Sequence, residues 1–422
     1  MAALRILISG AGIAGNALAF WLSKLGHEVT VVERFPHLRT TGLQLDLRGH
    51  GIQVLKRMGL EQAFRAKLAP EQGIQIVSGS GKRWAYFPVK KPGKGLQGFT
   101  TEYEILRGDL CRLLYDAAKD QTNFVFGTSI DSFEEKGDTV EVRFADGKTD
   151  SFDLVVGADG VGSRTRKLMI GTESKDPFYP VEDMYIAYFT MPRKIREGEQ
   201  YIASAYTATG GRAIMTRRLN ADELQVYLNC KSDSERLRNA RQGDVEEEKA
   251  AMAEVFKGAG WITDDILKSL RDVGDFYCER LGLIKMKPWY KGRVALVGDA
   301  AHCPAALTGM GTTSAFVGAY ILAGEIGRHC GRVRNDKEGN IKDGLPLALK
   351  AYDDKFRPFM DQVQKGVGEN ADSWPSTPLG ITIMNCILGA ASLLRINILG
   401  RFVLKEDVKG WDLPGYDELL RD

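Results

Sequence analysis

The stretch LRILISGAGIAGNALAFWLSKLGHEVTVVE, residues 4–33, decides the fold of this chain. It begins with an apolar strand over Leu4–Ser9 and passes through a glycine turn at 10–15 into a helix that ends near Leu25. A second apolar strand follows over Val29–Glu33. This order is typical of a dinucleotide-binding βαβ unit, so the sequence predicts an α/β fold with a Rossmann-like domain.

Each of the three glycines in this GxGxxG turn has a physical role in binding a dinucleotide. Gly10 permits the tight turn out of the strand, Gly12 lets the backbone approach a pyrophosphate, and Gly15 lets the helix pack on the strand. Ala14 lies within the same turn, and the N–H groups of the helix start face the anion. The alternative is a glycine-rich turn in an ordinary βαβ unit.

The second strand ends in an acid at the distance that a ribose contact requires. Glu33 lies 18 residues after Gly15 and can accept hydrogen bonds from ribose hydroxyls. This acid argues against a 2′-phosphate in the pocket, whereas Arg34 directly after it could accommodate one.

Composition is that of a folded globular enzyme. The 422 residues are 44% hydrophobic and 27% charged with a net charge of +2, which excludes disorder and gives no electrostatic reason to expect a nucleic-acid partner. The six Cys form no CxxC pair and the five His are dispersed, so neither a metal site nor a disulfide framework is predicted. The chain starts without a signal-peptide pattern, which favours a cytoplasmic location.

Two further motifs follow apolar strands. The segment 153–166 reads DLVVGADGVGSRTR, a buried strand and then a DGxxSxxR turn into a helix. The segment 293–302 reads RVALVGDAAH, and residues 307–314, LTGMGTTS, open a helix that runs to about Ile326. An Asp at the carboxyl end of a parallel strand lies where open α/β sheets bind ligands.

These three motifs, in this order, resemble those of the group A flavin monooxygenases, the para-hydroxybenzoate hydroxylase class of FAD enzymes. The resemblance covers roughly residues 1–370. The stretches GLQLDL (42–47) and EILRGDL (104–110) are most similar to tetracycline-inactivating and polyketide-tailoring members.

The resemblance implies roles for particular residues. FAD would be held at its pyrophosphate, ribose, ribityl chain and flavin ring by Gly10, Gly12, Gly15, Glu33, Arg107, Asp159, Gly160, Asp299, Gly311 and Thr312. Asp159 and Gly160 would also support the nicotinamide nucleotide. The chain departs from the common pattern at Ala305, where Pro is frequent, and at Thr313, where Asn is frequent.

The implied reaction is carried by the cofactor. NADPH or NADH reduces FAD, and a flavin C4a-hydroperoxide formed with O₂ delivers one oxygen atom to an aromatic, phenolic or polyketide substrate. No catalytic side chain is predicted, and His302 is expected to be structural or FAD-adjacent rather than a base. The alternatives are an FAD-dependent dehydrogenase or reductase without oxygen transfer, and a non-catalytic flavoprotein that sequesters a ligand.

The spacing of the motifs predicts a discontinuous FAD domain. We assign it residues 1–73, 101–175 and 276–345, with a β-sheet substrate domain over 74–100 and 176–275 and a C-terminal helical segment over 346–422. The nicotinamide donor, without a glycine motif of its own, would bind transiently on the FAD domain. The basic runs Arg217–Arg218 and Lys285–Lys291 are expected to be solvated.

Candidate substrate contacts come from both parts of this second layer. They are Tyr188, Tyr206 and Tyr227 of the sheet, whose alternative role is core packing, and Ile383, Met384 and Ile387 of the C-terminal helix. The uncharged run Leu379–Leu394 is 16 residues long, too short to span a bilayer, and is expected to pack on the two domains, with peripheral membrane attachment as the alternative. A monomer or a homodimer is expected.

Overall fold

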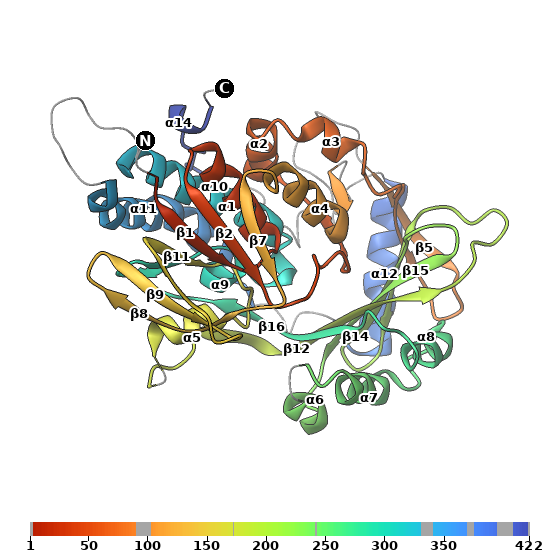
Figure 1. Ribbon diagram of the computed structural model, residues 1–422. Helices are drawn as coiled ribbons and strands as arrows, with labels where there is room; N and C mark the ends of the chain where they lie inside the picture. The colour runs from red at the N-terminus through yellow and green to blue at the C-terminus, as the bar shows by residue number, and fades with distance from the viewer. Residues whose placement is uncertain are drawn as a thin grey trace.

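The computed structural model describes residues 3–89, 103–171, 173–240, 243–330, 341–368, 375–394 and 408–420. Two large sheets and the helices around them make up the molecule (Figure 1). The predicted α/β class, with a Rossmann-like domain, a second β-sheet unit and C-terminal helices, is confirmed.

The first sheet holds the dinucleotide-binding unit. Its five parallel strands and one antiparallel edge strand lie in the order β17 (Tyr290–Lys291), β18 (Val294–Leu296), β11 (Leu154–Gly157), β1 (Arg5–Ser9), β2 (Glu28–Glu33) and β7 (Thr122–Phe126). Residues 6–8 of β1 and 154–156 of β11 are fully buried aliphatic residues, as expected for central parallel strands. All three motifs therefore leave neighbouring strands at the same edge of the sheet.

Helices pack on this sheet in two layers. α1 (Ile13–Lys24) packs against α4 (Arg107–Ala118) and α10 (Gly311–Cys330), and α10 packs in turn on α2 (Gly49–Arg57) and α11 (Leu345–Gln364). The smaller helical elements of this part are α3 (Glu61–Arg65), α5 (Arg164–Ile170), α9 (Asp299–His302), η1 (Ala306–Thr308), η2 (Ile341–Gly344) and α14 (Asp417–Leu420). Buried residues of α11 and of the segment 408–420 join the same core, so these C-terminal parts complete the first domain.

A three-stranded meander also packs against the first sheet. It consists of β8 (Ile130–Lys136), β9 (Thr139–Phe144) and β10 (Thr149–Phe152). Its buried residues Ile130, Val140, Val142 and Phe152 belong to the core of the first domain.

The second sheet has seven strands. Their order is β16 (Tyr277–Ile284), β12 (Phe178–Pro192), β15 (Glu223–Lys231), β14 (Arg212–Arg218), β13 (Ala203–Ala208), β4 (Gly73–Val77) and β5 (Arg83–Pro88). The neighbouring pairs are antiparallel except β13 with β4. β3 (Gln44–Asp46) and β6 (Glu104–Leu106) form a separate antiparallel pair. This pair contacts the second sheet, because Arg217 of β14 donates to Glu104 of β6.

Period-2 alternation gives this second sheet two different faces. Phe189, Val226 and Leu228 face a core formed with α6 (Glu235–Asn239), α7 (Val245–Phe256) and α8 (Thr263–Leu270). Their neighbours in sequence, such as Tyr188 and Tyr227, point to the other side, toward the first domain.

Two boundaries differ from the sequence assignment. β16 belongs to the second sheet, although residues 276–345 were assigned to the FAD domain, because its backbone pairs with β12. The segment 346–422 does not form one unit, since α11 joins the first core and α12 (Pro378–Leu393) packs on β5. The predicted hairpin of β4 and β5 is confirmed, whereas residues 90–102 and most of the polar loop 329–345 lie outside the described residues.

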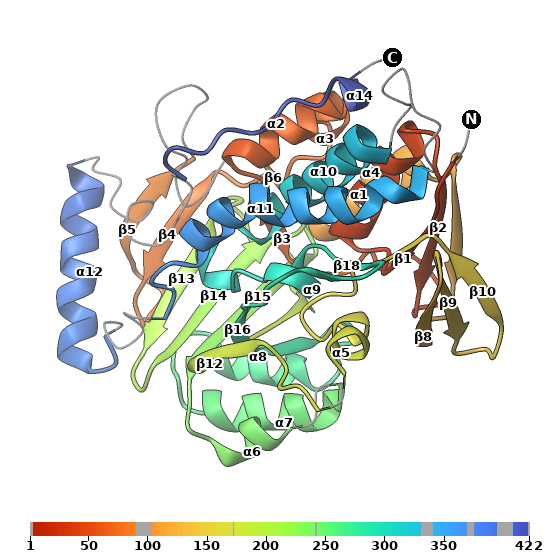
Figure 2. The same ribbon diagram turned by 90° about the vertical axis from the view of Figure 1, so that its left-hand side faces the viewer.

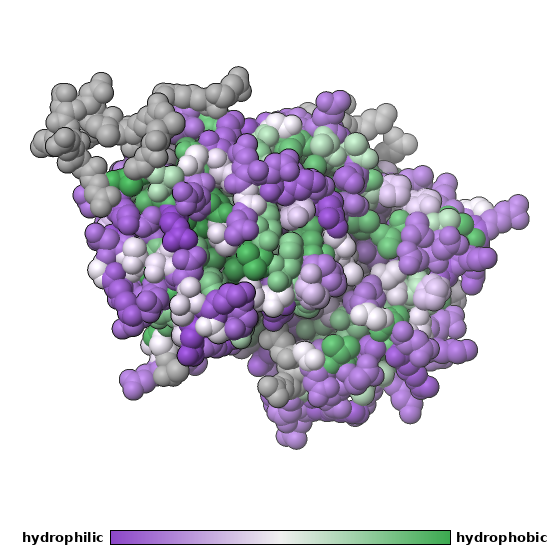
Figure 3. Space-filling view, viewed as in Figure 1, coloured by the Kyte–Doolittle hydropathy of each residue, from purple (hydrophilic) through white to green (hydrophobic). Residues whose placement is uncertain are grey.

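The C-terminal helix α12 lies at the periphery of the molecule. Figure 2 shows it as the outermost element beside β5, on the side away from the first sheet. No helix among the described residues has the length and apolar character needed to cross a membrane. In the view of Figure 3 the rim of the molecule is polar and apolar side chains gather toward the middle of the face.

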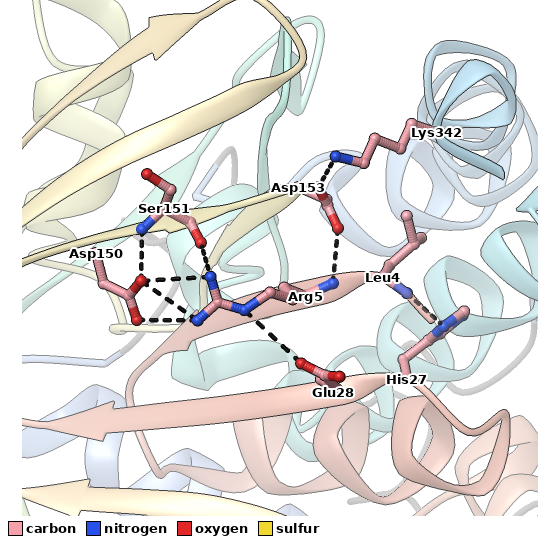
Figure 4. A network of polar contacts seen from close by, with 8 residues as sticks. All are labelled: Leu4, Arg5, His27, Glu28, Asp150, Ser151, Asp153 and Lys342. Carbon is pink, nitrogen blue, oxygen red and sulfur yellow. Dashed lines mark hydrogen bonds and ion pairs between the residues drawn. The ribbon is translucent and has the colours of Figure 1, made fainter. Parts of the chain in front are cut away.

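A polar network ties the elements together at the start of the strands. Arg5 pairs with Glu28 and Asp150, and the Arg5 N–H donates to the Asp153 carboxylate over 2.8 Å (Figure 4). Lys342 of η2 also pairs with Asp153, at 2.6 Å. Because this network precedes β1 and β11, it lies at the end of the sheet opposite the glycine turn, and its role is structural.

Candidate functional site

The three glycines of the turn differ in how much space a side chain would have at each position. A Cβ on Gly10, whose φ is +108°, would lie 2.7 Å from the Ala158 carbonyl oxygen, and one on Gly15 would lie 1.9 Å from the Gly10 carbonyl oxygen. A Cβ on Gly12 would meet only Arg107, at 4.0 Å from Nη2. Gly10 and Gly15 are therefore needed for the packing of the protein itself, whereas Gly12 leaves space open in front of Arg107.

Ala14 connects this turn with the third motif. A Cβ on Gly298, at the end of β18, would lie 2.7 Å from the Cβ of Ala14. A larger side chain at position 14 would therefore push apart the two motifs that flank the predicted cofactor site.

The side chain of Glu33 closes the βαβ unit by binding backbone N–H groups. Its carboxylate accepts the Ala11 N–H over 3.0 Å and the Phe35 N–H over 3.1 Å. Arg34 is exposed, and its guanidinium lies 4.9 Å from the centre of the Phe35 ring. The acid thus fixes the shape of the glycine turn from the neighbouring strand, at the position expected for the ribose.

Arg107 lies in the site rather than on the outer surface. It is the first residue of α4 and packs along Gly42, where a Cβ would lie 2.8 Å from its Cδ. Its Nη1 donates to the Thr41 carbonyl over 3.3 Å. Its guanidinium therefore faces Gly12, so a phosphate that approaches Gly12 would also meet this cation.

The second motif forms a capped helix start. Asp159 accepts from the Thr165 N–H and hydroxyl, each over 2.9 Å, and from the Ser163 hydroxyl. Ser163 in turn caps α5 by accepting the Arg166 N–H. Gly160 has a φ of +81° with open space around it, so it supplies the turn conformation that this loop needs.

Arg166 was missed by the sequence analysis as a site residue. Its side chain is fully buried and donates to the Ala300 carbonyl over 3.0 Å, to the Val161 carbonyl over 2.6 Å and to Asp176. It thereby ties the DG turn to the residue that follows Asp299. The signal was present as the last letter of DGxxSxxR, but spacing alone does not reveal its partner.

The third motif places a carboxylate opposite Arg107. Asp299 is the first residue of α9, and burial raises the pKa of its carboxyl while the nearby positive charge of Arg107 lowers it. Glu279 of β16 lies close enough that the Asp299 charge adds to the burial that raises the Glu279 pKa. Glu279 accepts the Tyr277 hydroxyl over 2.8 Å.

The start of α10 is held by an unexpected partner. Gly311 is the first residue of α10 and has open space around it, and Thr312 follows it almost fully buried. Thr313, at the position where Asn is frequent, accepts the Arg48 N–H over 2.9 Å and donates to the Arg48 carbonyl over 3.2 Å. Although Thr replaces the frequent Asn at this position, its hydroxyl bonds both the N–H and the carbonyl of Arg48, in the backbone after β3.

His302 lies in an aromatic cage and not beside an open space. Its ring is 4.9 Å from that of Trp289 and 5.0 Å from that of Phe356, and its Nε2 lies 3.4 Å from the Tyr352 hydroxyl. Burial lowers the pKa of the imidazole to about 3. This arrangement supports the expectation that His302 is structural.

A cavity of about 10 Å³, which has room for about one water molecule, lies between the first domain and the second sheet. Its walls are Gly42, Leu43, Tyr188, Phe189, Thr190, Gln225, Tyr227 and Asp275. Tyr227 donates to Gln225 Oε1 over 3.1 Å and accepts the Gln44 N–H over 3.2 Å, which fixes its ring. Two of the three predicted tyrosines, Tyr188 and Tyr227, are therefore brought together here.

The other predicted substrate contacts lie elsewhere. Tyr206 points to the opposite face of the sheet, where it packs on Trp261 and donates to the Ala259 carbonyl over 2.8 Å, so its assignment to the pocket is corrected. Ile383, Met384 and Ile387 lie on α12, which packs on β5, and β5 is four strands and hence roughly 19 Å from β15. The expectation that they share one pocket with the tyrosines is corrected as well.

A buried ionic cluster underlies this cavity, and the sequence analysis did not find it. Arg217 of β14 lies 3.4 Å from Glu71 and 3.2 Å from Glu104, and all three side chains are less than a tenth exposed. Gln44 donates to Glu104, and the Arg217 guanidinium lies 5.9 Å from the centre of the Tyr227 ring. The pair Arg217–Arg218, expected to be solvated, is buried, with Arg218 bound to Glu199.

The charges of this cluster do not balance unless one proton is retained. Two carboxylates face one guanidinium in a water-excluded place, and burial together with the Glu104 charge raises the pKa of Glu71 to about 8, against the lowering effect of Arg217. Glu71 and Glu104 lie on the two crossings between the domains, before β4 and in β6. The cluster therefore joins both crossings to the sheet.

The residues fit an FAD molecule. Gly12 leaves open the approach that a Cβ would narrow, and Arg107 supplies a cation in front of it. Glu33 at the end of β2 and Asp299 after β18 lie at the same edge of the sheet, with β1 and β11 between their strands. Gly10, Gly12, Ala14, Gly15, Glu33, Arg107, Asp159, Gly160, Asp299, Gly311 and Thr312 all gather at one edge of the first sheet, at the turns and helix starts that follow its strands or at α4.

Comparison with known proteins agrees with this geometry. The protein-family description "FAD binding domain" matches residues 3–331. The FAD-dependent monooxygenase asL4 of Sarocladium schorii is 51% identical over 433 residues, with 100% of both chains covered. The flavin-dependent monooxygenase eupH of a Phoma species is 40% identical over 409 residues, with 93% of both chains covered.

A solved structure extends the similarity to three dimensions. The tetracycline destructase Tet(51) is 28% identical with a TM-score of 0.76, and 99% of this chain and 100% of that chain are covered. With the cofactor-binding turns in place and relatives of this kind along its whole length, the chain belongs to the FAD-dependent monooxygenases.

Proposed function

We propose that this enzyme hydroxylates an electron-rich carbon of a phenolic or polyketide substrate, with NADPH or NADH as the electron donor and O₂ as the oxygen source. The observation that carries the proposal is the position of the cavity lined by Tyr188, Gln225 and Tyr227. It shares the wall Gly42–Leu43 with the cofactor cradle, because Gly42 packs directly on Arg107.

Bound FAD supplies the redox chemistry, reduction by the nicotinamide donor and activation of O₂. The chain's own residues would hold and orient it: Gly12 and Arg107 at the phosphates, Glu33 at the adenosine ribose, and Asp299 at the ribityl side. Gly311 and Thr312, at the start of α10, would lie at the flavin ring. Arg34, exposed beside Glu33, is available to the 2′-phosphate of an NADPH donor.

The tyrosines of the cavity have different roles toward a substrate. Burial raises the pKa of Tyr188 to about 12, so its hydroxyl keeps its proton at neutral pH and can donate it to a carbonyl or phenolate oxygen. The Tyr227 hydroxyl already donates to Gln225, so Tyr227 forms a fixed wall.

The relatives support the proposed substrate class. Tet(51) is named a tetracycline destructase, and asL4 and eupH are named monooxygenases. We therefore propose a multi-ring or phenolic polyketide, with tetracycline as a first compound to test. A cytoplasmic location and a monomeric or homodimeric state remain proposals of the same kind.

The test is oxygen incorporation. Purified holoenzyme is incubated with NADPH or NADH under ¹⁸O₂ and with tetracyclines, anthraquinones or simple phenols, and products are analysed by mass spectrometry. We expect a product heavier by one ¹⁸O atom from at least one compound class. Donor oxidation without any oxygen gain would instead support a reductase, and no donor-dependent bleaching of the flavin would support a ligand-sequestering flavoprotein.

Matched tyrosine variants test the pocket. Tyr188→Phe removes the proposed donor, and we expect KM to rise about 10-fold with a smaller change in kcat. Tyr206→Phe removes a hydroxyl on the opposite face of the same sheet and should lower stability while KM stays unchanged. Equal KM values for both variants would contradict the assignment of Tyr188.

A further inference from the structure

Helix α12 presents an apolar face to solvent. The helix spans Pro378–Leu393, and the described segment 375–394 contains no charged residue. Its inner face packs on β5, where the Ser392 hydroxyl accepts the Tyr86 N–H and donates to the Tyr86 carbonyl. Ile381, Asn385 and Ala391 are buried on this inner side, and Leu388 joins the small core under β4 and β5.

Five of the nine large aliphatic side chains that are exposed in the described chain lie in the segment 379–394. Leu379 is 71% exposed, Leu393 86% and Leu394 70%, and Ile383 and Ile387 are each about half exposed. Thr382, Cys386 and Ala390 lie between them and are also exposed. The spacing 379, 383, 386, 390, 393 places these residues along one stripe of a helix, directly opposite the side that meets the sheet.

A surface helix that is apolar on both sides normally buries both sides. The exposed face of α12 contains no charge that would select a charged partner or an anionic surface. It is complementary to a second uncharged apolar helix face, which another copy of this chain supplies.

We propose that two copies of this chain form a homodimer by antiparallel packing of their α12 helices along this stripe. A two-fold axis makes such an interface self-complementary, so the same residues serve on both sides. The two copies would meet where Figure 2 shows α12 as the outermost element of the molecule.

The area suits a reversible dimer. At about 100 Å² of side-chain surface for each large aliphatic residue, the five named residues and their small neighbours offer roughly 600 Å² per copy. The pair would then cover roughly 1,200 Å², the lower end of what specific interfaces bury. We therefore expect association in the micromolar range rather than an obligate dimer.

The position of Cys386 makes the proposal testable without new cysteines. It is the ninth of the sixteen residues of α12, at the midpoint of the stripe, and it is exposed, whereas the other five cysteines are buried. In a fully overlapping antiparallel pair the two Cys386 residues meet at the two-fold axis. With helix axes 8–10 Å apart, facing Cα atoms come within the separation that a disulfide bridges.

The experiment uses the holoenzyme over a range of about 1 to 100 μM, in which a micromolar dimer forms. Sedimentation velocity measures mass, and mild copper-phenanthroline oxidation followed by non-reducing electrophoresis detects a cross-link. We expect a concentration-dependent dimer and a covalent dimer that Cys386→Ser abolishes. The double variant Leu379→Glu with Leu393→Glu should weaken association at least about 100-fold, because four charges would be buried in the pair.

Controls separate the interface from unfolding and from other occupants. Leu347→Glu changes an exposed leucine of α11 and should leave the dimer intact, and bound-flavin absorbance reports folding of every variant. A monomer at all concentrations, a dimer unaffected by the double variant, or a dimer without the Cys386 cross-link would overturn the proposal. So would α12-dependent binding of the monomer to phosphatidylcholine vesicles, which would make a membrane the occupant.

Discussion

Three glycines of one turn should respond differently to the same added methyl group. In Gly15→Ala the new Cβ would lie 1.9 Å from the Gly10 carbonyl oxygen, whereas such atoms normally stay about 3.3 Å or more apart. The helix must therefore move away from the turn by more than an ångström, at a cost of about 3 kcal/mol or more in unfolding free energy. Gly10→Ala combines crowding at 2.7 Å with a φ of +108°, which adds about 1–3 kcal/mol of strain.

Gly12→Ala should behave in the opposite way. Its backbone, with φ −79° and ψ −168°, suits any residue, and the nearest atom to a new Cβ is Arg107 Nη2 at 4.0 Å. The stability of the FAD-free protein should therefore change by less than about 1 kcal/mol. The methyl group would, however, keep a pyrophosphate away from the turn, and we expect the Kd for FAD to rise about 10- to 100-fold, or about 1.4–2.7 kcal/mol.

The assay separates these two effects. Thermal unfolding is measured for FAD-stripped wild type and variants, with and without added FAD, and the Kd for FAD is taken from flavin fluorescence quenching. Gly26→Ala is the control, because Gly26 also has a positive φ but nothing within 4 Å, so it should cost only about 1 kcal/mol.

The reasoning would be refuted by either of two results. One is an FAD-free Gly12→Ala protein that loses as much stability as Gly15→Ala. The other is a Gly12→Ala protein that binds FAD as tightly as wild type, which would mean that the open space in front of Arg107 does not receive the phosphates.

Three further predictions concern charged or titratable side chains. Folding raises the Glu71 pKa from 4.5 to about 8, so the stability that protonated Glu71 contributes is complete below about pH 4.5 and is lost as pH rises to about 8. Over this range the melting temperature of Glu71→Gln should fall less than that of wild type, and parallel pH profiles of the two proteins would contradict a proton held on Glu71. The His302 imidazole is neutral above about pH 3, so His302→Leu should lower the melting temperature yet leave the shape of the pH–rate profile between about pH 5 and 9 unchanged. If the variant's profile lost its acidic or basic limb, His302 would be identified as a base. Arg107→Gln should weaken FAD binding about 10- to 100-fold with little change in the melting temperature of the FAD-free protein, and an unchanged Kd would exclude Arg107 from the phosphate site.

The cofactor half of the site could be predicted from sequence because its signals are local. Gly10, Gly12 and Gly15 act through backbone geometry within one turn, and the spacing to Glu33 is set by one helix and one strand. Asp159 and Asp299 follow apolar strands, and parallel strands bring such residues to the same edge of a sheet. Arg166 was missed, although it belongs to a recognised motif, because its partner at Ala300 lies 134 residues away.

The substrate half could be predicted only in part. Alternation along β12, β13 and β15 separates Tyr188 from Phe189 and Tyr227 from Val226, but period-2 patterning does not state which face meets the first domain. Tyr206 therefore carried the same signal as the other two tyrosines and lies on the opposite face. The residues of β16 likewise do not state which strand it pairs with, so its sheet could not be assigned from them.

The sequence by itself determined the dinucleotide-binding unit and the three cofactor turns, since backbone freedom, strand burial and helix starts depend on neighbours along the chain. The order of these turns also carried the resemblance that implied the class of enzyme. Only the tertiary structure decided that Arg217 meets Glu71 and Glu104, which tyrosines face the cofactor, and that one face of α12 is left bare. Pairing of buried charges and the choice of face depend on contacts between segments more than a hundred residues apart, as between Glu104 and Arg217, and no local pattern encodes them.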